Sequence, residues 1–571
     1  MYIKNMQFIS YLQRAMKFFI LYTELYKKLS EKEITDMLKD GKILVGRSSQ
    51  GKDTVLLPKM ANRHGLIAGA TGTGKTVTLK VLAESFSDLG VPVFLADVKG
   101  DLSGMIKPGA GMEERVSALG LEGFAYKNYP TVFWDIYGQS GIPLRTTVSE
   151  MGPLLLSRIL GLNDTQGDIL TVAFKIADDE GLLLTDTKDL KALLNYISEN
   201  NKELAAEYGK MSPVSISAIL RAVVALEMAG GETFFGEPAL SIHDLISLGT
   251  EGRGTVNILD SKSLIQNNTL YSMFLLWLLS ELFENLPEVG DLDKPKFVFF
   301  FDEAHLLFKG TPSHLLEKIE QVVKLVRSKG VGIYFITQNP RDIPDGVLAQ
   351  LGNRIEHALH AYTPAEQKAV KAAAASFREN PAFDTYEAIM GLGTGEAVIS
   401  LLGEDGAPSM AEKATILPPQ SALGEADAAS KDAAVKGAIL YSKYAQAVDN
   451  DSAYEFLQRR GLEAQAAAEQ AAADAAAAKE QAKAEAAALK EKEKAEAAAL
   501  REKEKAEAKA EKEKQAREKR VTKSIGHAVT GTVGREIGKA AGSPFGKIGK
   551  RLGGNVGASL GRGILDTLFK L

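Results

Sequence analysis

The sequence predicts an α/β protein whose parallel sheet is doubly wound, with helices on both faces. Two observations lead to this fold class. An apolar run, a glycine-rich loop and a helical pattern follow one another between residues 65 and 86, and apolar strands then alternate with helical patterns as far as residue 359. We expect a helical insertion within this core, and after the core a long charged helix and a Gly-rich basic tail.

The composition excludes several classes of protein. The 571 residues are 45% hydrophobic, enough to fill a sizeable core, and the formal net charge is −5. The chain therefore lacks the global basic excess of many nucleic-acid-binding proteins, although a groove can still be basic locally. No cysteine is present, so disulfides and thiolate metal sites are excluded, which suits a cytoplasmic location. The longest apolar run, residues 273–279, is far shorter than the roughly 20 residues of a membrane span.

Two segments precede the predicted site. Residues 1–40 are expected to form an N-terminal helical extension, because their aromatic and aliphatic side chains recur at helical spacing. Residues 41–145 form the first part of the predicted nucleotide core. This part begins with two short strands within residues 43–58 and continues with strands at residues 91–97 and 131–136.

The centre of the prediction is the loop that follows a short apolar strand ending at Ala68. Its sequence matches the phosphate-binding pattern of a glycine, four residues and then Gly-Lys-Thr. Glycines allow backbone N–H groups to turn towards a phosphate, and the N-terminus of the next helix adds partial positive charge. We expect Lys75 to neutralise the outer phosphates and the Thr76 hydroxyl to bind Mg²⁺. The predicted nucleotide-binding residues are Gly69, Ala70, Thr71, Gly72, Thr73, Gly74, Lys75, Thr76 and Val77.

Three charged residues lie at the end of the strand at residues 91–97. Asp97 ends this strand, and Lys99 and Asp101 come directly after it. Ligands gather at the carboxyl ends of parallel strands, so these residues are candidates for the site. A turn-capping role explains them equally well.

The core is interrupted and then resumes. Residues 146–240 have mostly helical spacing and predict the helical insertion. Residues 241–420 form the second part of the core, with strands at residues 254–259, 297–301, 331–336 and 354–359. The five apolar residues 297–301 are typical of a central parallel strand.

Polar residues after these strands complete the predicted ATPase site. Asp302 directly follows a buried strand and is expected to bind Mg²⁺, while Glu303 acts as the general base that activates water. Gln338 ends the next strand and orients the water or senses the outer phosphate, although it could also be a strand cap. Arg354 supplies positive charge to the transition state, although a surface ion pair is an equal alternative. The predicted catalytic residues are thus Lys75, Glu303, Gln338 and Arg354, the Mg²⁺ ligands are Thr76 and Asp302, and the cofactors are ATP and Mg²⁺.

The C-terminal part has a different composition. Residues 421–520 are rich in Ala, Glu and Lys and contain eleven-residue repeats, which keep equivalent positions nearly aligned on a straight helix. Leu489 and Leu500 are too few for a strong coiled-coil seam, so we expect a long solvated helix, with a coiled coil or a disordered linker as alternatives. Residues 521–571 form the Gly-rich basic tail, which could dock on a protein partner or contact nucleic acid or an anionic membrane surface.

Together these motifs resemble the HerA/FtsK superfamily of P-loop DNA translocases, and most of all its bacterial HerA-like ATPase subfamily. The resemblance covers about residues 41–417 and is carried by residues 61–76, 96–102, 301–307, 336–340 and 351–354. It implies a RecA-like core, Mg²⁺-dependent ATP hydrolysis, a homohexamer and DNA that moves through a central channel. Arg354 would then act on the site of a neighbouring subunit.

Three other functions are alternatives to this one. A two-lobed helicase of the Asp-Glu-Ala-His type would need a second lobe, which the repeats and tail cannot supply. A GTPase is disfavoured because the chain has no Asn-Lys-x-Asp motif. An ATPase switch in a membrane-associated or protein-interaction assembly remains as the alternative function.

Overall fold

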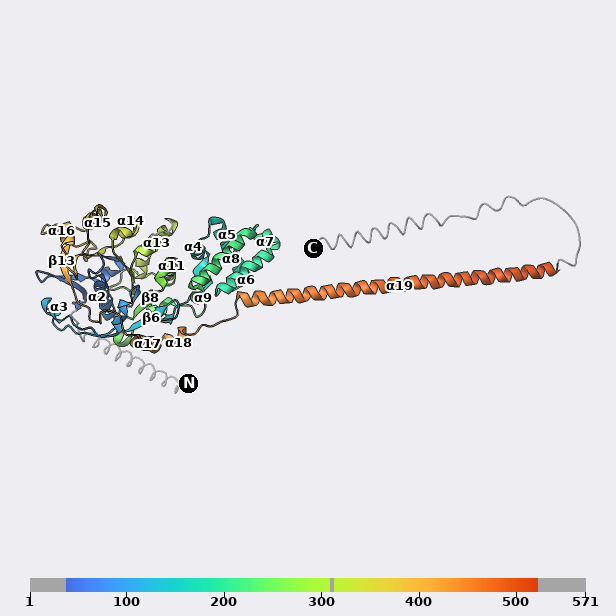
Figure 1. Ribbon diagram of the computed structural model, residues 1–571, viewed down its shortest axis with the longest axis horizontal. Coiled ribbons are helices and arrows are strands. Elements are labelled where there is room, and N and C mark those ends of the chain that lie inside the picture. The colour runs from blue at the N-terminus through green and yellow to red at the C-terminus, as the bar shows by residue number, and fades with distance from the viewer. Residues whose placement is uncertain (1–36, 309–312, 522–571) are drawn as a thin grey trace, which may run out of the picture. The chain divides into compact units, whose positions relative to one another are not determined.

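The structure is a computed structural model that describes residues 37–308 and 313–521 (Figure 1). It divides into two units, Met1–Ala464 and Gln465–Leu571. Most of the predicted N-terminal extension and nearly all of the predicted tail lie outside the described residues.

Within the described residues, thirteen strands form one mixed sheet in the order β1-β2-β13-β12-β11-β4-β10-β9-β5-β8-β6-β7, with β3 paired to β2. The strands are β1 (Leu38–Lys39), β2 (Lys42–Ser48), β3 (Asp53–Leu56), β4 (Gly65–Ala68), β5 (Val93–Asp97), β6 (Thr131–Asp135), β7 (Ile142–Pro143), β8 (Val256–Asp260), β9 (Phe297–Phe301), β10 (Val331–Thr337), β11 (Asn353–His357), β12 (Glu396–Ser400) and β13 (Glu412–Ile416).

The predicted α/β class is confirmed, but the sheet is mixed. The strands from β11 to β7 in this order run parallel, whereas β12, β13 and β2 extend the sheet antiparallel from β11. Two neighbours of β4 matter for the site. β10 separates β4 from β9 on one side, and β11 borders β4 on the other.

Aromatic packing explains why the centre of the sheet is so apolar. All five residues of β9 are buried, and the ring of Phe299 stacks on Phe94 of β5 with centroids 4.8 Å apart. Phe300 faces α2 (Lys75–Asp88), whose Phe86 ring lies 6.3 Å away. Phe94 instead meets Phe274 of α11 (Asn268–Asn285) at 6.4 Å. Helices therefore cover both faces, as a strand that is buried on both sides requires.

A bundle of helices forms the insertion, and the predicted helical character of this segment is confirmed (Figure 1). Capping boxes at Asn163 and Asp186 satisfy the free N–H groups at the starts of two of these helices. The helices are α4 (Val148–Ile159), α5 (Asp164–Glu180), α6 (Thr187–Glu199), α7 (Asn201–Tyr208), α8 (Pro213–Leu226), α9 (Glu232–Phe234) and α10 (Ile242–Leu245), with a π-helical turn η3 (Glu227–Gly231).

One helical stretch among the described residues, Pro213–Phe234, is long and apolar enough to cross a membrane by length and composition alone. Within it, Ile216, Ile219 and Val223 are buried. α8 packs on α5 and α6 of the insertion. In this fold, these three apolar side chains belong to the core of the insertion.

The remaining helices of the core come between the strands along the chain. They are α3 (Glu113–Ala118), α12 (His305–Phe308), α13 (Ser313–Val326), α14 (Asp345–Leu348), α15 (Pro364–Ala375) and α16 (Thr385–Met390). Short 3₁₀ helices are η1 (Pro58–Arg63), η2 (Asp101–Ile106), η4 (Thr250–Gly252), η5 (Leu264–Gln266), η6 (Arg327–Lys329) and η7 (Pro340–Asp342). α15 and α16 pack on a small apolar cluster of their own, which includes Leu359 and Val398.

The folded core extends further along the chain than the predicted boundary at residue 420. Residues 420–453, here called the strap, pack against it and include α17 (Ala428–Gly437) and α18 (Tyr441–Tyr444). The buried carboxylate of Glu84 on α2 accepts hydrogen bonds from the backbone N–H groups of Gln420, at 2.7 Å, and Ser421, at 3.1 Å. Further along, the ring of Tyr444 lies 5.6 Å from Trp134. The Ala-rich composition hid these contacts, because each depends on one polar or aromatic residue.

The strap leads into one long helix, α19 (Ala453–Val521). Its first turns contact the insertion, where Asp189 accepts hydrogen bonds from Ser452 Oγ at 2.6 Å and from the Tyr454 N–H at 2.8 Å. From Gln458 to Gln515 its described side chains are exposed, as expected for a solvated helix. The coiled-coil alternative needs a second helix and stays a prediction.

Candidate active site

The phosphate loop lies between β4 and α2, at the carboxyl end of the parallel strands. Gly69, Gly72 and Gly74 have φ angles of +145°, +81° and +116°, which side-chain-bearing residues rarely adopt. A Cβ atom at Gly69 would lie only 2.5 Å from the Cβ of His357 on β11. The glycines are therefore required by both backbone conformation and space.

Hydrogen bonds within the phosphate loop hold its conformation. The ammonium group of Lys75 donates to the carbonyls of Gly69, at 2.6 Å, and Ala70, at 2.9 Å. The hydroxyl of Thr73 donates to the Ala70 carbonyl at 2.8 Å. Burial lowers the pKa of Lys75, and the charge of Lys99 lowers it further. Lys75 is thus held over the loop, where an anion would relieve its desolvation.

The other predicted loop residues differ in exposure. Thr71 and Gly72 are exposed at the tip, whereas Thr76 and Val77 are half-buried in the first turn of α2. The N-terminus of this helix points its free N–H groups at the loop, an arrangement suited to phosphate oxygens.

The second group of site residues, at the ends of β9 and β10, surrounds Glu303. It follows β9 with a φ of +50°, an uncommon value for a residue other than glycine, and it is 7% exposed. Lys99 Nζ lies 3.3 Å from its Oε1, and His305 Nδ1 lies 3.4 Å from its Oε2. The side-chain amide of Gln338 donates to both carboxylate oxygens, at 3.4 and 3.2 Å. Backbone strain held by such contacts is common where a side chain must point into a site.

The neighbouring Asp302 is half-buried. Burial, and then the charge of Glu303, raises the pKa of Asp302 to about 7. Its Oδ1 accepts a hydrogen bond from the N–H of Glu303 at 2.9 Å. A cation bound beside Asp302 would stabilise its carboxylate form, so the site suits a cation.

The three charged residues at the end of β5 have different roles in the structure. The carboxylate of Asp97 accepts from the N–H groups of Gly100, at 2.6 Å, and Leu102, at 3.1 Å, so it caps the turn into η2. Burial raises the pKa of Asp97 to about 6. Lys99 instead reaches Glu303, as described above. Asp101 begins η2.

Arg354 has a different environment from the one the sequence suggested. Its guanidinium donates to the backbone carbonyls of Leu351 and Leu348, both at 3.1 Å, and of Ser376 at 3.3 Å. These contacts fix the turn before β11 to α14 and to the end of α15. Within residues 37–308 and 313–521, its hydrogen bonds go to backbone carbonyls and not to an acidic side chain. Its predicted action on a neighbouring subunit stays a prediction.

Residues beside β11 and β12 also support the loop, and they were not predicted from the sequence. The Ala358 carbonyl accepts from the Ala70 N–H at 2.8 Å, and Nε2 of the buried His357 lies 2.8 Å from the hydroxyl of Thr78. The Gly395 N–H donates to the Thr73 carbonyl at 2.8 Å, and Arg115 holds the Gly395 carbonyl at 2.7 Å. A lone histidine or glycine carries no motif, so only the fold could reveal these contacts.

A buried carboxyl group also lies beside the loop. Glu356 on β11 pairs in register with Ala68, the last residue of β4, and is 2% exposed. Burial raises the pKa of Glu356 to about 8, and the charge of Lys75 opposes this shift. The residue adds negative charge near Lys75 when it ionises.

The residues present fit Mg²⁺ only in combination with a nucleotide. No group of three or more His, Asp or Glu side chains that could hold a metal occurs in residues 37–308 and 313–521. Mg²⁺ at phosphate sites takes few protein ligands and completes its shell with phosphate oxygens and water. The Thr76 hydroxyl and the Asp302 carboxylate would be those ligands.

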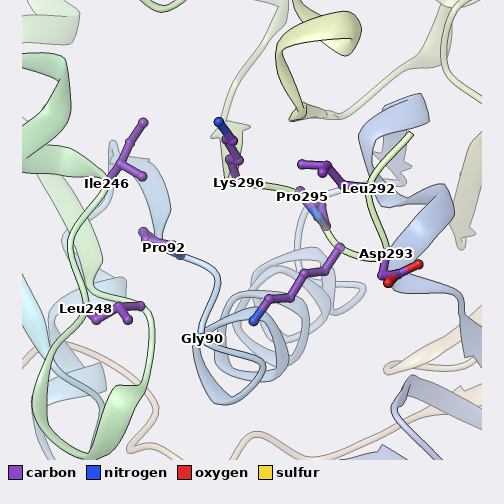
Figure 2. A pocket seen from close by; sticks show the side chains of 9 residues that line it. Gly90, Pro92, Ile246, Leu248, Leu292, Asp293, Pro295 and Lys296 are labelled. Carbon is purple, nitrogen blue, oxygen red and sulfur yellow. The ribbon is translucent and has the colours of Figure 1, made fainter. Parts of the chain in front are cut away.

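An apolar cleft of about 370 Å³ lies elsewhere in the core, as Figure 2 shows. Gly90 and Pro92 come just before β5, and Pro295 and Lys296 come just before β9. The cleft is therefore at the amino ends of these strands, opposite the phosphate loop, and it is separate from the site.

Comparisons with known proteins point in one direction. A family model described as Helicase HerA-like C-terminal matches residues 42–551. The DNA double-strand break repair helicase HerA of Sulfurisphaera tokodaii is 22% identical over 381 residues, which cover 65% of this chain and 69% of that protein. The DNA import protein CedB of Sulfolobus acidocaldarius is 25% identical over 313 residues, 54% of this chain and 46% of that protein, so the match spans about half the length of CedB.

Two solved structures are similar over most of their length. The bacterial conjugative coupling protein TrwBdeltaN70 is 15% identical, with a TM-score of 0.47, and the match covers 71% of this chain and 94% of that one. VirB4 of Thermoanaerobacter pseudethanolicus is also 15% identical, with a TM-score of 0.44 and coverage of 66% and 98%.

Proposed function

Because this chain belongs to the HerA-like helicase C-terminal family, we propose that it is a Mg²⁺-dependent ATPase that moves or unwinds DNA as a ring of identical subunits. The proposal includes membership of the bacterial HerA-like ATPase subfamily, a homohexamer and a cytoplasmic location. Its ATPase part rests on the geometry of the site, and its DNA part rests on relatives.

One observation carries the ATPase part. Glu303 contacts Gln338 and Lys99, and it follows Asp302 at the edge of the sheet where the phosphate loop also lies. A carboxylate flanked by an amide and an ammonium group is positioned to accept a proton from a water molecule. Glu303 adopts a positive φ, and strained backbone of this kind clusters at active sites.

The residues divide the work as follows. Backbone N–H groups of the loop and Lys75 bind and orient the phosphates, and Gln338 holds the orientation of Glu303. Mg²⁺, when bound between Thr76 and Asp302, would neutralise charge on the outer phosphate oxygens. Glu303 removes the proton from the attacking water. Arg354 of an adjacent subunit is the proposed source of transition-state charge.

DNA as the substrate that the motor moves is supported by the names of the similar proteins. HerA is named as a DNA double-strand break repair helicase, and CedB as a DNA import protein. The ATPase part of the proposal is tested by substitution of Glu303, the proposed general base. Glu303→Gln should abolish steady-state hydrolysis of ATP and leave ATP binding intact, and turnover at the wild-type rate would refute the assignment.

The alternative function is an ATPase switch in a membrane-associated or protein-interaction assembly. The observation in its favour is the exposed side of the stretch Pro213–Phe234, where Val214 is 76% and Met228 is 86% exposed. Sedimentation with anionic liposomes that requires residues 521–571 or these apolar side chains would favour this alternative.

A further inference from the structure

Two exposed aromatic side chains stack on each other in the segment between β11 and α15. The ring centroids of His360 and Tyr362 are 5.6 Å apart, and the ring planes differ by 23°. Tyr362 is 84% exposed. One face of its ring meets His360, and the other face is therefore open to solvent.

The local fold does not need this pair. Thr363 caps α15 through a capping box with Glu366, and Leu359 fills the small apolar cluster under α15 and α16. Only the backbone of Tyr362 takes part in the cap, and its side chain does not belong to the cluster, which Ala358 and Ala361 of the segment also join. An exposed ring, already stacked on one side, is instead suited to bind a second planar group.

The segment lies beside the phosphate loop. The Ala358 carbonyl accepts the hydrogen bond of the Ala70 N–H at 2.8 Å, which fixes the start of the segment against the loop. Tyr362 is four residues further on, so its backbone lies within roughly 14 Å of that contact. A nucleotide bound by the loop is therefore within reach of the Tyr362 side chain.

The order of strands gives the direction in which a nucleotide would lie. Glu303 and Gln338 follow β9 and β10, on one side of β4. The outer phosphate must approach this side, because the proposed base and its partner are there. The nucleoside end then leaves the loop on the opposite side, where β11 borders β4 and continues into the segment of His360 and Tyr362.

The geometry points to Tyr362, backed by His360, as a stacking platform for the base of the bound nucleotide. This inference deepens the proposed function and rests on it. A stacked ring binds through the π-face that every base has, so it gives affinity without reading hydrogen bonds. The ligand class is a nucleoside triphosphate, whose planar base stacks on the ring.

The test separates the base from the phosphates. Binding of Mg-ATP and of Mg-tripolyphosphate, which lacks the nucleoside, is measured by calorimetry on the full chain. We expect Tyr362→Ala to weaken ATP binding about tenfold, the size of a lost base–aromatic stack, and to leave tripolyphosphate binding unchanged. Tyr362→Phe keeps the ring and should bind ATP like the wild type. Tyr454→Ala removes a tyrosine that is 40% exposed on the first turn of α19 and serves as the matched control.

Several outcomes would overturn the inference. They are equal losses for ATP and tripolyphosphate, full ATP affinity in Tyr362→Ala, and a loss of affinity for single-stranded DNA with ATP binding retained. Should Tyr362→Ala fail to fold, Tyr362→Leu keeps apolar volume without a π-face and must show the same selective loss. Failure of the proposed function looks different, because the wild type would then bind ATP without hydrolysing it, or Lys75→Ala would retain both ligands.

Discussion

The side-chain amide of Gln338 lies within hydrogen-bonding distance of both oxygens of the Glu303 carboxylate, 3.2 Å from Oε2 and 3.4 Å from Oε1. The two residues follow adjacent parallel strands, β10 and β9, so the sheet register itself sets their separation. An amide donor fixes the plane of the carboxylate and leaves lone pairs free to accept a proton from water.

Loss of this contact should lower turnover more than binding. We expect Gln338→Ala to reduce kcat for ATP between about 10- and 100-fold, because a misoriented base is less effective, with a smaller change in KM. In the Glu303→Gln background the same change should add little, since the two residues act as a unit. Gln139→Ala, on an exposed turn, is the control. Equal kcat in Gln338→Ala and wild type would contradict the orienting role.

Arg354 can be tested by mixing subunits. Arg354→Ala and Glu303→Gln should each be inactive alone. A mixture should regain activity if Arg354 acts across a subunit boundary, because some sites then combine an intact Glu303 with an intact Arg354 from the neighbour. No gain on mixing, together with a lowered Tm for Arg354→Ala, would restrict Arg354 to its three carbonyl contacts within the chain.

The strap should depend on Glu84. This buried carboxylate accepts hydrogen bonds from the N–H groups of Gln420 and Ser421 and from the Ser421 hydroxyl, and the buried Lys80 donates to the Ala422 carbonyl. Glu84→Ala leaves several buried donors unpaired, which should destabilise the fold by about 3 kcal/mol. Hydrogen exchange should rise first at residues 420–422. The exposed Glu379→Ala is the control, and unchanged exchange in Glu84→Ala would contradict the attachment.

The buried His64 should make stability depend on pH. Its Nδ1 accepts a hydrogen bond from the Ile333 N–H at 3.0 Å, and burial lowers its pKa from 6.5 to about 4. Between these values the unfolded chain binds a proton on this residue and the folded chain does not, so this contribution to stability is lost as pH falls. The loss is about 2 kcal/mol at pH 5.

A difference measurement isolates this effect from the titration of buried carboxyl groups. Urea unfolding of the wild type and of His64→Gln is compared at about pH 7.5 and about pH 5. We expect the wild type to lose more stability than the variant over this range. Parallel losses in the two proteins would show that His64 does not titrate as described.

Much of the sheet could be predicted because its strands carry their own signal. The run 297–301 is buried on both faces, so it is continuously apolar, and the Gly-Lys-Thr loop follows its strand directly. The antiparallel extension was harder. The pairing of β12 with β11 and of β13 with β2 joins segments that lie far apart in the chain.

The site was predictable only where a motif reports chemistry. Asp302 and Glu303 stand out because paired carboxylates rarely end an apolar strand. His357 and Gly395 have no such signal, since their role depends on a neighbour brought close by the sheet. The strap was hidden for the same reason, because Glu84 and Gln420 are 336 residues apart.

In the proposed function, ATP hydrolysis drives movement on DNA by a ring of these chains. The most direct measurement is the ATPase rate of the purified protein with and without double-stranded DNA, together with particle mass by native mass spectrometry. We expect a hexamer whose ATPase rate rises on addition of DNA and disappears in Glu303→Gln. A monomer, or a rate that double-stranded DNA leaves unchanged at every salt concentration, would contradict it.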